Sequence, residues 1–366
     1  MKKEQFIYEK PIVYIIIATI AIGCLMLYSA SSTVAFNKFG DSAFYIKRHL
    51  VRLVISLIAF FIAYKINFKF FKQNAAKLLI FSWIVMLFAY FFNEGSSTRR
   101  FLIINGQNII TTSDFSKLCL IIFTAQFIEN NKNKINNLKI LLTRYLPYLS
   151  VTLLLILGQP DLSSTFTILI LISLILLSAG INIKYLFYSG IFGIMSALLL
   201  LKEFQMNRFI NWWSGESNSQ AKNAINALGN GGLKGVGFDN SIIKEGFLPE
   251  VHTDFILPII GEEFGFIGIL FMFFLFLSLY FLGIRICKSA PDIFSSMLCL
   301  GITLNILIYF LINVCYVVGF IPTTGLAIPF FSYGGSHTLF NLFSLGVLLN
   351  ISKHTNLYKY KYISHE

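Results

Sequence analysis

The chain has 366 residues, of which 56% are hydrophobic and only 13% are charged, and its formal net charge is +12. Soluble domains carry about 25% charged residues, so this composition excludes an ordinary water-soluble fold. The basic residues form no continuous stripe with interleaved aromatic residues, which excludes a nucleic-acid partner and favours anionic lipid headgroups.

Apolar runs recur along nearly the whole chain, and about 20 apolar residues span the hydrocarbon of a bilayer. The runs predict an all-α membrane protein, a single polytopic domain over residues 1–366 with about ten transmembrane helices. The first run follows a basic start and lacks a small-residue cleavage site, so we expect a retained helix. The expected helices cover 11–31, 49–66, 77–93, 113–129, 139–158, 161–180, 184–202, 255–286, 292–319 and 329–352.

The loops differ in charge from one side of this arrangement to the other. Positive residues in short loops are retained in the cytoplasm. Basic residues crowd the loops after the second and fourth expected helices, for example Lys65, Lys69, Lys72, Lys132 and Lys134. Both termini are therefore predicted to be cytoplasmic, and residues 203–254 to form a long extracytoplasmic loop between the seventh and eighth helices.

The long loop contains two distinctive patterns. The stretch 208–213 is amphiphilic and ends in two tryptophans, an arrangement typical of a segment at the membrane interface. The glycine-rich run 229–237 could bring backbone amides close to an anionic ligand. Glycines in loops more often make turns, and we favour turns here.

The densest polar cluster runs from Leu248 to Phe255 at the start of the eighth expected helix, and Glu262 and Glu263 follow. From spacing alone, a helix cap formed by Thr253 or Asp254 and a functional carboxylate are equally supported. Carboxylates two turns inside a membrane helix should face a protein interior or a wet cavity. At 100° per residue Glu262 would lie about 80° from Asp254 and Glu263 about 180°, so only Glu262 is predicted to share a cavity with Asp254.

Three cations are expected at the outer mouth of the helix bundle. Arg48 lies at the outer end of the second expected helix, Arg100 precedes the fourth, and Lys117 lies one turn inside the fourth. At that depth Lys117 needs a partner, and Asp114, three residues earlier, is the favoured one. Three cations at one mouth also suggest a phosphate-bearing ligand, because Arg matches phosphate in bidentate geometry and Lys acts as a point charge.

Two segments interrupt the apolar pattern with proline and glycine. Within 158–164, Pro160 is expected to end one helix, and Asp161 or Ser163 to cap the next. The segment 321–336 holds too much proline, glycine and hydroxyl for a lipid-facing helix. Irregular backbone at such depth should line a cavity or be buried by protein.

Taken together and in this order, these motifs resemble the SEDS family (shape, elongation, division and sporulation) of bacterial membrane glycosyltransferases, and within it the FtsW branch more than the RodA branch. Phe101 and Asp114 depart conservatively from the Trp and Glu that are usual in the family. The resemblance spans essentially the whole chain and rests on Arg100-Phe101, 113–117, 159–162, 231–237, 248–255, 261–263 and 322–336, with Lys244, Gly261 and 322–325 favouring the FtsW branch.

The resemblance implies a peptidoglycan glycosyltransferase that polymerises lipid II, an undecaprenyl-pyrophosphate-linked disaccharide pentapeptide, on the outer face of the bacterial inner membrane for the division septum. It implies that Asp254 is the catalytic aspartate, and a carboxylate at a water-facing helix end suits a general base. The expected partner is a class B penicillin-binding transpeptidase. The expected substrate-binding residues are Arg48, Arg100, Lys117, Asp161, Glu262, Ser332 and Ser336.

No dedicated metal site is expected. The five cysteines lie in or beside apolar runs without metal-like spacing, so neither a zinc site nor a disulfide framework is predicted. A divalent cation, Mg²⁺ or Mn²⁺, could share the neutralisation of the pyrophosphate by binding through Asp254 and the substrate phosphates.

Three other functions were weighed against polymerisation at the septum. Broken helices and buried carboxylates also suit a transporter or a flippase of the lipid-linked precursor. Against transport, the chain shows no similar halves, and its polar groups cluster at the outer face. An elongation polymerase of the RodA type shares the chemistry, and a scaffold that only recruits enzymes leaves Asp254 and the cations unexplained.

Overall fold

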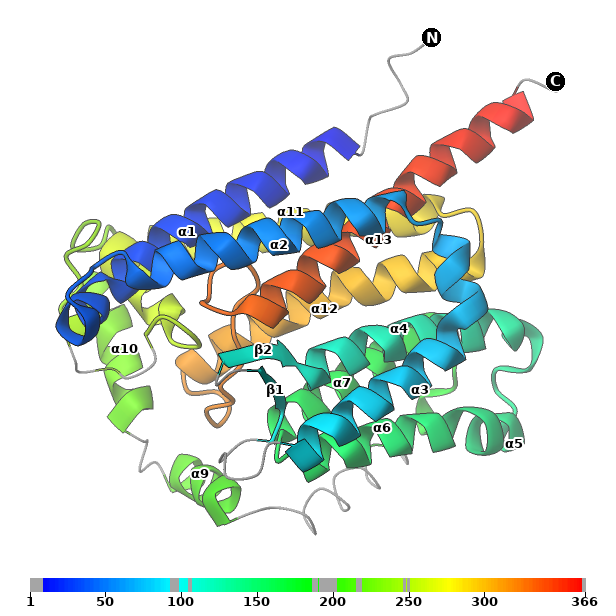
Figure 1. The fold of residues 1–366 in the computed structure, drawn as a ribbon, viewed down its shortest axis with the longest axis horizontal. Coiled ribbons are helices and arrows are strands. Elements are labelled where there is room, and N and C mark those ends of the chain that lie inside the picture. The colour runs from blue at the N-terminus through cyan, green and yellow to red at the C-terminus, as the bar shows by residue number, and fades with distance from the viewer. Residues whose placement is uncertain are drawn as a thin grey trace.

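The computed structural model describes residues 9–92, 99–104, 107–185, 190, 203–214, 219–245, 248 and 251–363. Figure 1 shows long helices that run side by side, with α1 beginning and α13 ending at the same end of the molecule. The helix α10 and the connection between α1 and α2 lie at the opposite end. This arrangement suits an even number of membrane crossings, while the orientation of the termini stays a prediction.

Helices account for nearly all of the regular structure, as the composition predicts. Every expected helix except 184–202 is matched by an observed helix or by a continuous helical run, and 184–202 falls almost wholly outside the described residues. The matching helices are α1 (Glu9–Phe39), α2 (Phe44–Lys65), α3 (Phe68–Phe92), α4 (Thr112–Asn130), α5 (Leu138–Ile140) with the π-helical Leu141–Tyr145 and α6 (Leu146–Gly158), α7 (Leu162–Ser178), α11 (Ile256–Ser289), α12 (Ile293–Val317) and α13 (Gly335–Ile363).

Some helices are long and apolar enough to cross a membrane, and others are sheltered by them. Among the described residues, five helical spans meet the requirement by length and composition: 10–39, 68–92, 138–158, 256–289 and 293–317. By contrast, α4 carries several polar residues but is buried along most of its length against α3, α7 and α12. A helix surrounded by other helices can keep polar side chains, because its neighbours and not lipid solvate them.

Two boundaries differ from the sequence prediction for visible reasons. The helix α3 begins at Phe68 and not at 77, because Asn350 of α13 bridges the corner before it. The Asn350 side chain donates to the carbonyl of Tyr64 (2.6 Å) and accepts from the amide of Phe68 (3.2 Å). The helix α13 begins at Gly335 and not at 329, since Phe330 has a φ of 70°, outside the helical region.

A small β-hairpin was not predicted. The strands β1 (Phe101–Ile104) and β2 (Gln107–Thr111) pair antiparallel, with an irregularity between Leu102 and Ile103. Apolar residues on both sides of an Asn-Gly dipeptide in the sequence are a recognised hairpin signal. The hairpin matters for the site because it returns the chain beside Arg100 just where α4 begins.

The predicted long loop contains helices. These are α9 (Glu203–Trp213), α10 (Ser219–Gly231) and a 3₁₀ turn at Ile243–Glu245. The amphiphilic stretch 208–213 is part of α9, where Trp212 donates to the carbonyl of Gly319 at 2.8 Å and Trp213 is 78% exposed. One tryptophan thus ties α9 to the connection between α12 and α13, and the other faces outward.

The glycine-rich run makes turns and packs against a break in α11. Gly265 interrupts α11 with φ 63° and ψ −160°, which leaves nearby backbone groups without partners inside the helix. The amides of Val236 and Gly237 donate to the freed carbonyls of Glu262 and Glu263, each at 3.0 Å. Residues 229–231 of the run end α10, and the interpretation as turns is confirmed for the part that follows, whose two amides are used within the protein.

Close backbone packing explains one glycine of the run. Gly235 has a φ of 80°, and a Cβ atom there would lie 2.1 Å from the carbonyl oxygen of Glu263. No other residue could occupy this position without moving the backbone.

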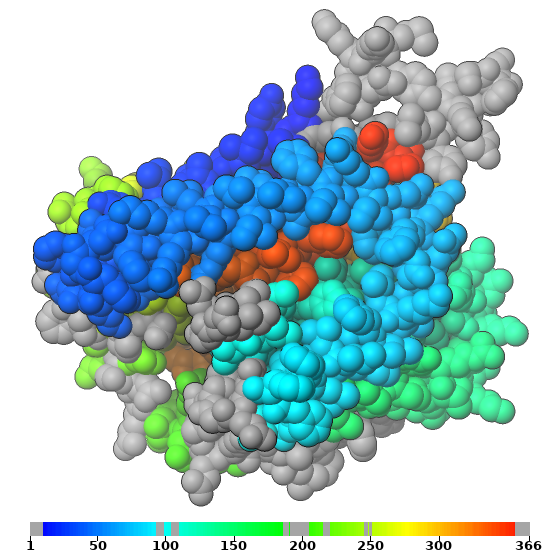
Figure 2. Space-filling model, in the orientation of Figure 1, coloured from blue at the N-terminus to red at the C-terminus, as the bar shows by residue number. Residues whose placement is uncertain are grey.

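The later part of the irregular segment before α13 is buried by protein, as predicted, whereas residues 321–325 are half-buried or exposed. Phe330, Phe331 and Ser332 are buried, and a Cβ atom on Gly23 of α1 would lie 2.2 Å from the carbonyl oxygen of Phe330. In Figure 2 the following helix, α13, is visible as an orange strip between α2 and the cyan residues of α3. The segment therefore enters the protein interior before α13 begins.

Candidate active site at the outer mouth

Side chains from several elements meet where α4 begins. Thr112 donates to Gln159 (2.9 Å), and Ser113 donates to Asp161 (3.0 Å), which links α4 to the turn before α7. The hydroxyls of Thr111 and Ser336 lie 2.6 Å apart and link the end of the hairpin to the start of α13. These contacts bring three segments that are far apart in the sequence to one place, which we call the outer mouth after the predicted topology.

Asp161 caps α7 and holds Arg100. Its carboxylate accepts from the amide of Ser164 (3.1 Å) and lies 3.7 Å from Nη1 of Arg100. Asp161 is buried, whereas the Arg100 side chain is 32% exposed. Of the two expected caps Asp161 is therefore confirmed, and it keeps the guanidinium of Arg100 at the mouth.

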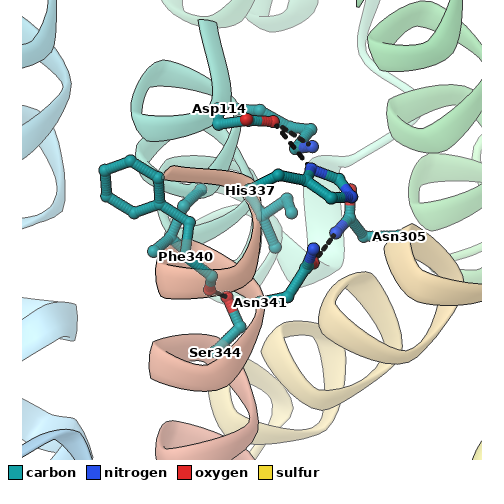
Figure 3. A pocket seen from close by; sticks show the side chains of 9 residues that line it. Asp114, Asn305, His337, Phe340, Asn341 and Ser344 are labelled. Atoms are coloured by element: carbon teal, nitrogen blue, oxygen red, sulfur yellow. Dashed lines mark hydrogen bonds and ion pairs between the residues drawn. The ribbon is translucent and has the colours of Figure 1, made fainter. Parts of the chain in front are cut away.

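The expected pair between Asp114 and Lys117 is confirmed. Nζ of Lys117 lies 3.0 Å from Oδ1 of Asp114 and 3.8 Å from the centre of the Tyr309 ring. His337, two residues into α13, brings Nδ1 to 3.5 Å from the same carboxylate oxygen. Figure 3 shows Asp114 facing His337, with Asn305 and Asn341 below them. This buried group lies one turn inside α4, directly after the residues that contact Asp161.

Asp254 lies just before α11 and is not its N-cap. The helix begins at Ile256, and Phe255 occupies the N-cap position without a side-chain hydrogen bond. The backbone carbonyl of Asp254 accepts from Asn313 Nδ2 (2.9 Å) and from the Tyr316 hydroxyl (2.5 Å), both on α12. The backbone of Asp254 is thus held by α12, while its side chain is half-buried and accepts from the hydroxyl of Thr253 at 2.8 Å.

One short stretch joins Asp254 to the start of α7. Ser163 donates to the carbonyl of Thr324 at 2.7 Å, and the next residue, Gly325, has a φ of 69°. A Cβ atom on Gly325 would lie 3.5 Å from Oδ2 of Asp254. Asp254 therefore belongs to the same outer mouth as Asp161 and Arg100, through the segment that the sequence marked as irregular.

The cation on α2 that faces the protein is Arg52. Arg48 is exposed and stacks on Phe44 at 4.2 Å, and within the described residues no contact links it to Arg100 or Lys117. Arg52, one turn further along α2, is half-buried and lies 4.7 Å from the Tyr333 ring. Sequence reasoning missed Arg52, although an arginine deeper in a membrane helix has the stronger need for a protein environment.

The two expected serines have structural contacts. Ser332 is buried, and its hydroxyl accepts from the amide of Ile328 at 2.9 Å. Ser336 contacts Thr111, as described above. Both serines shape the backbone around the outer mouth, and their role as substrate ligands stays a prediction.

Glu262 and Glu263 bind the long segment between α9 and α11. Glu262 is fully buried and accepts from the hydroxyl of Ser241, from Asn230 Nδ2 (3.3 Å) and from the amide of Ile243 (3.3 Å). The helical extrapolation from Asp254 was wrong, because residues 251–255 form turns and α11 starts only after them. The partners found for Glu262 all come from the long segment.

Glu263 is the centre of a second buried set of contacts. Its Oε1 accepts from the hydroxyl of Ser29 (2.5 Å) and lies 3.3 Å from Nζ of Lys244. Lys244 is itself buried and also pairs with Asp239. Glu263 thus connects α1 and α11 to the long segment. We call Glu262, Glu263 and these partners the double-glutamate latch.

Comparison with known proteins gives a consistent result over nearly the full length. The family model described as "Cell cycle protein", which groups FtsW, RodA and SpoVE, matches residues 10–357. A protein of Trichlorobacter lovleyi named probable peptidoglycan glycosyltransferase FtsW is 32% identical, covering 94% of this chain and 93% of its own length. Stage V sporulation protein E of Bacillus subtilis is also 32% identical, with 94% and 96% covered.

Solved structures show the same fold. A chain from a study of the structural coordination of polymerisation and crosslinking by a peptidoglycan synthase complex superimposes with a TM-score of 0.76 at 19% identity, covering 94% of this chain and 97% of that one. The rod shape determining protein RodA of Thermus thermophilus gives a TM-score of 0.69 at 20% identity, with 93% and 95% covered. The multi-pass helical fold expected from the sequence is confirmed.

Proposed function

The chain belongs to the FtsW, RodA and SpoVE family and is a peptidoglycan glycosyltransferase, and we propose that it polymerises lipid II into glycan chains on the outer face of the inner membrane. The FtsW relatives support a role at the division septum over the alternative of elongation. In the corresponding orientation both termini are cytoplasmic, and α9 and α10 lie outside.

The observation that carries the catalytic part of the proposal is the position of Asp254. Its backbone is held by Asn313 and Tyr316, the N-cap position of α11 is taken by the next residue, Phe255, and the carboxylate is half-buried beside Gly325. A carboxylate at such a place can accept the proton of the acceptor sugar hydroxyl as that oxygen attacks the anomeric carbon of the donor. The undecaprenyl pyrophosphate then leaves with the electron pair of the broken glycosidic bond.

The pyrophosphate requires positive charge and hydrogen-bond donors. Arg100 is partly exposed at the mouth, and its Nε is buried without a partner among the described residues. The hydroxyl of Thr324, beside Gly325, is likewise buried without a partner in this part of the chain. We assign Arg100, Arg52 and Lys117 to the stabilisation of the leaving group, since charge that develops on phosphate oxygens is best met by fixed cations.

A divalent cation fits the site only together with the substrate. Across the described ranges, no three His, Cys, Asp or Glu side chains come together as a metal cluster. The carboxylate of Asp254 is one hard oxygen donor, and Mg²⁺ or Mn²⁺ would find its remaining ligands on the substrate phosphates and water. When bound, the metal would supply charge neutralisation at the pyrophosphate.

The proposal also includes a partner, a class B penicillin-binding transpeptidase with one membrane helix. The decisive experiment purifies the full chain with that partner and supplies lipid II in detergent. Glycan chains resolved on a gel support the polymerase. Vesicles that translocate lipid II while no polymer forms in detergent would instead establish a flippase, and binding of the partner without either activity would establish a scaffold.

A further inference from the structure

A small pocket lies below Asp114 in Figure 3, and Lys117 also lines it. It has room for about one water molecule. Its wall includes Asp114, Lys117, Asn305, His337, Asn341 and Ser344. It lies between α4, α12 and α13, inside the protein and one turn below the outer mouth.

Three buried polar atoms of this wall lack a hydrogen-bond partner within the described part of the chain. They are Nε2 of His337, Oδ1 of Asn305 and Nδ2 of Asn341. All three residues are buried, with exposed fractions of 9% for His337, 4% for Asn305 and 3% for Asn341. The two asparagines already bond to each other, because Asn305 Nδ2 donates to Asn341 Oδ1 at 3.1 Å. Buried polar atoms without partners are costly, so three of them around one pocket indicate a missing ligand.

The three atoms match the hydrogen-bonding capacity of one water molecule. Water donates twice, and Oδ1 of Asn305 and Nε2 of a neutral His337 are acceptors. Water also accepts, and Nδ2 of Asn341 can donate to it, because the bond from Asn305 goes to Oδ1 and leaves both Nδ2 protons without a partner among the described residues. An anion would leave both acceptors unsatisfied, and a metal cation would meet the donor proton of Asn341.

The same water would settle which nitrogen of His337 carries the proton. If Nε2 accepts from the water, the proton of the neutral ring lies on Nδ1. Nδ1 is the atom that faces Oδ1 of Asp114, at 3.5 Å. The pocket and the ion pair are therefore coupled through one imidazole ring.

We propose that one water molecule occupies this pocket and fixes His337 as the Nδ1–H tautomer, which makes His337 a positioning residue and the second donor to Asp114. The proposal rests on the proposed function, in which Lys117 meets the substrate pyrophosphate. When the ammonium of Lys117 turns toward the phosphate, Asp114 loses its 3.0 Å partner in a buried place. His337 then donates a hydrogen bond to the Asp114 carboxylate. This bond lowers the free-energy cost of moving the Lys117 ammonium away from Asp114.

The test uses two substitutions that each preserve one half of the imidazole. In His337→Asn the amide nitrogen can take the place of Nδ1 and still donate to Asp114, whereas the side chain is too short to reach the water. In His337→Gln the longer side chain reaches the pocket in place of Nε2 and loses the donor to Asp114. Both variants are purified with the transpeptidase, and KM and kcat for lipid II are measured.

We expect His337→Gln to raise KM for lipid II by about tenfold, with a small change in kcat, because a hydrogen bond to a charged group is lost when substrate binds. We expect His337→Asn to keep KM within about threefold of wild type. Equal KM values for the two variants would overturn the proposal. A purely structural role of His337 would lower the melting temperature of both variants and leave the KM of the folded fraction unchanged.

Two further measurements separate this proposal from the proposed function. In a high-resolution structure of the complex, water density between His337, Asn305 and Asn341 supports the proposal, and an empty pocket or a bound ion overturns it. Lys117→Met is measured beside the His337 variants. If it raises KM while His337→Gln does not, only the role of His337 is refuted. If neither changes KM, the phosphate role of Lys117 is refuted as well.

Discussion

The outer mouth and the double-glutamate latch both place carboxylates beside a basic side chain, but they differ in how completely those groups are enclosed. In the latch, Glu262, Glu263 and Lys244 are all buried, and their partners come from α1 and the long segment. In the mouth, Asp254 is half-buried and Arg100 is 32% exposed. A charged residue in a membrane protein is therefore no sufficient sign of catalysis, and access from the outside distinguishes the two regions.

The largest effect is expected in the latch, from Lys244→Met. The substitution leaves Glu263 buried without its cation, and breaking a buried pair in this way costs about 3–5 kcal/mol. We expect a strongly lowered melting temperature in detergent and poor accumulation in the membrane. The measurement is a thermal melt followed by size-exclusion chromatography.

Two controls sharpen this result. The double variant Lys244→Met with Glu263→Gln should recover part of the loss, because the buried charge is removed with its partner. Lys47→Met removes the exposed pair with Asp41 and should cost less than about 1 kcal/mol. If Lys244→Met and Lys47→Met had the same melting temperature, the latch would have no structural role. The proposed difference between the latch and the mouth would then be wrong.

The second prediction contrasts Asp254→Asn with Glu262→Gln. Asparagine is nearly isosteric with aspartate but cannot accept a proton at neutral pH, so Asp254→Asn should lose about 10²-fold or more in polymerisation rate. Its fold and its binding to the transpeptidase should remain. Glu262→Gln should show the opposite, with about 1–3 kcal/mol lost in stability and normal activity per folded molecule.

Both variants are assayed for glycan chains from lipid II, at equal amounts of folded protein. Wild-type activity in Asp254→Asn would mean that the catalytic base lies elsewhere, with Asp161, the other carboxylate of the outer mouth, as the next candidate. If folded Glu262→Gln were inactive, Glu262 would have a catalytic role and not only a structural one.

Contacts between residues close together in the sequence could be predicted, and contacts between residues far apart in the sequence could not. The pair of Asp114 and Lys117 and the cap formed by Asp161 rest on contacts within one helical turn, and both were predictable. The angle from Asp254 to Glu262 assumed a continuous helix across 251–255, where the chain forms turns. Contacts over long separations, such as Ser163 with Thr324, leave no periodic signal in a single sequence.

The choice between Arg48 and Arg52 illustrates the same limit. Both arginines lie on α2, four residues apart, and charge counting alone cannot say which of them faces the protein. The deciding contact is with Tyr333, which is almost the whole chain away in sequence. His337 could not be predicted from the sequence for a similar reason, because its neighbours in space come from α4 and α12.

The third prediction tests whether Arg52 or Arg48 binds the substrate at the mouth. Arg100→Ala and Arg52→Ala should each raise KM for lipid II by about tenfold, since each removes a fixed cation from the phosphate site. Arg48→Ala, the matched control on the surface of α2, should change KM by less than about twofold. An effect of Arg48→Ala as large as that of Arg100→Ala would return Arg48 to the substrate site.

The smallest effect is expected at the contact that joins α9 to the connection leading into the mouth. Trp212 donates to the carbonyl of Gly319, three residues before the stretch 322–326 that passes Asp254. Trp212→Phe keeps an aromatic ring but removes the donor and part of the ring surface, so at least about 0.5–1.5 kcal/mol of stability should be lost with the hydrogen bond. Trp213→Phe is the control, because Trp213 is largely exposed and should contribute less.

The contact of Trp212 with Gly319 could stabilise the fold only, or it could also affect catalysis, and kcat distinguishes these two roles. A bond that merely fastens α9 lowers the melting temperature and leaves kcat unchanged. A bond that transmits the position of the long segment to Asp254 lowers kcat by a larger factor than the loss of folded protein explains. Measuring the melting temperature and kcat of Trp212→Phe therefore decides whether the position of the long segment affects Asp254. A kcat at the wild-type value would mean that Asp254 is positioned without α9, by contacts such as those with Asn313 and Tyr316 of α12.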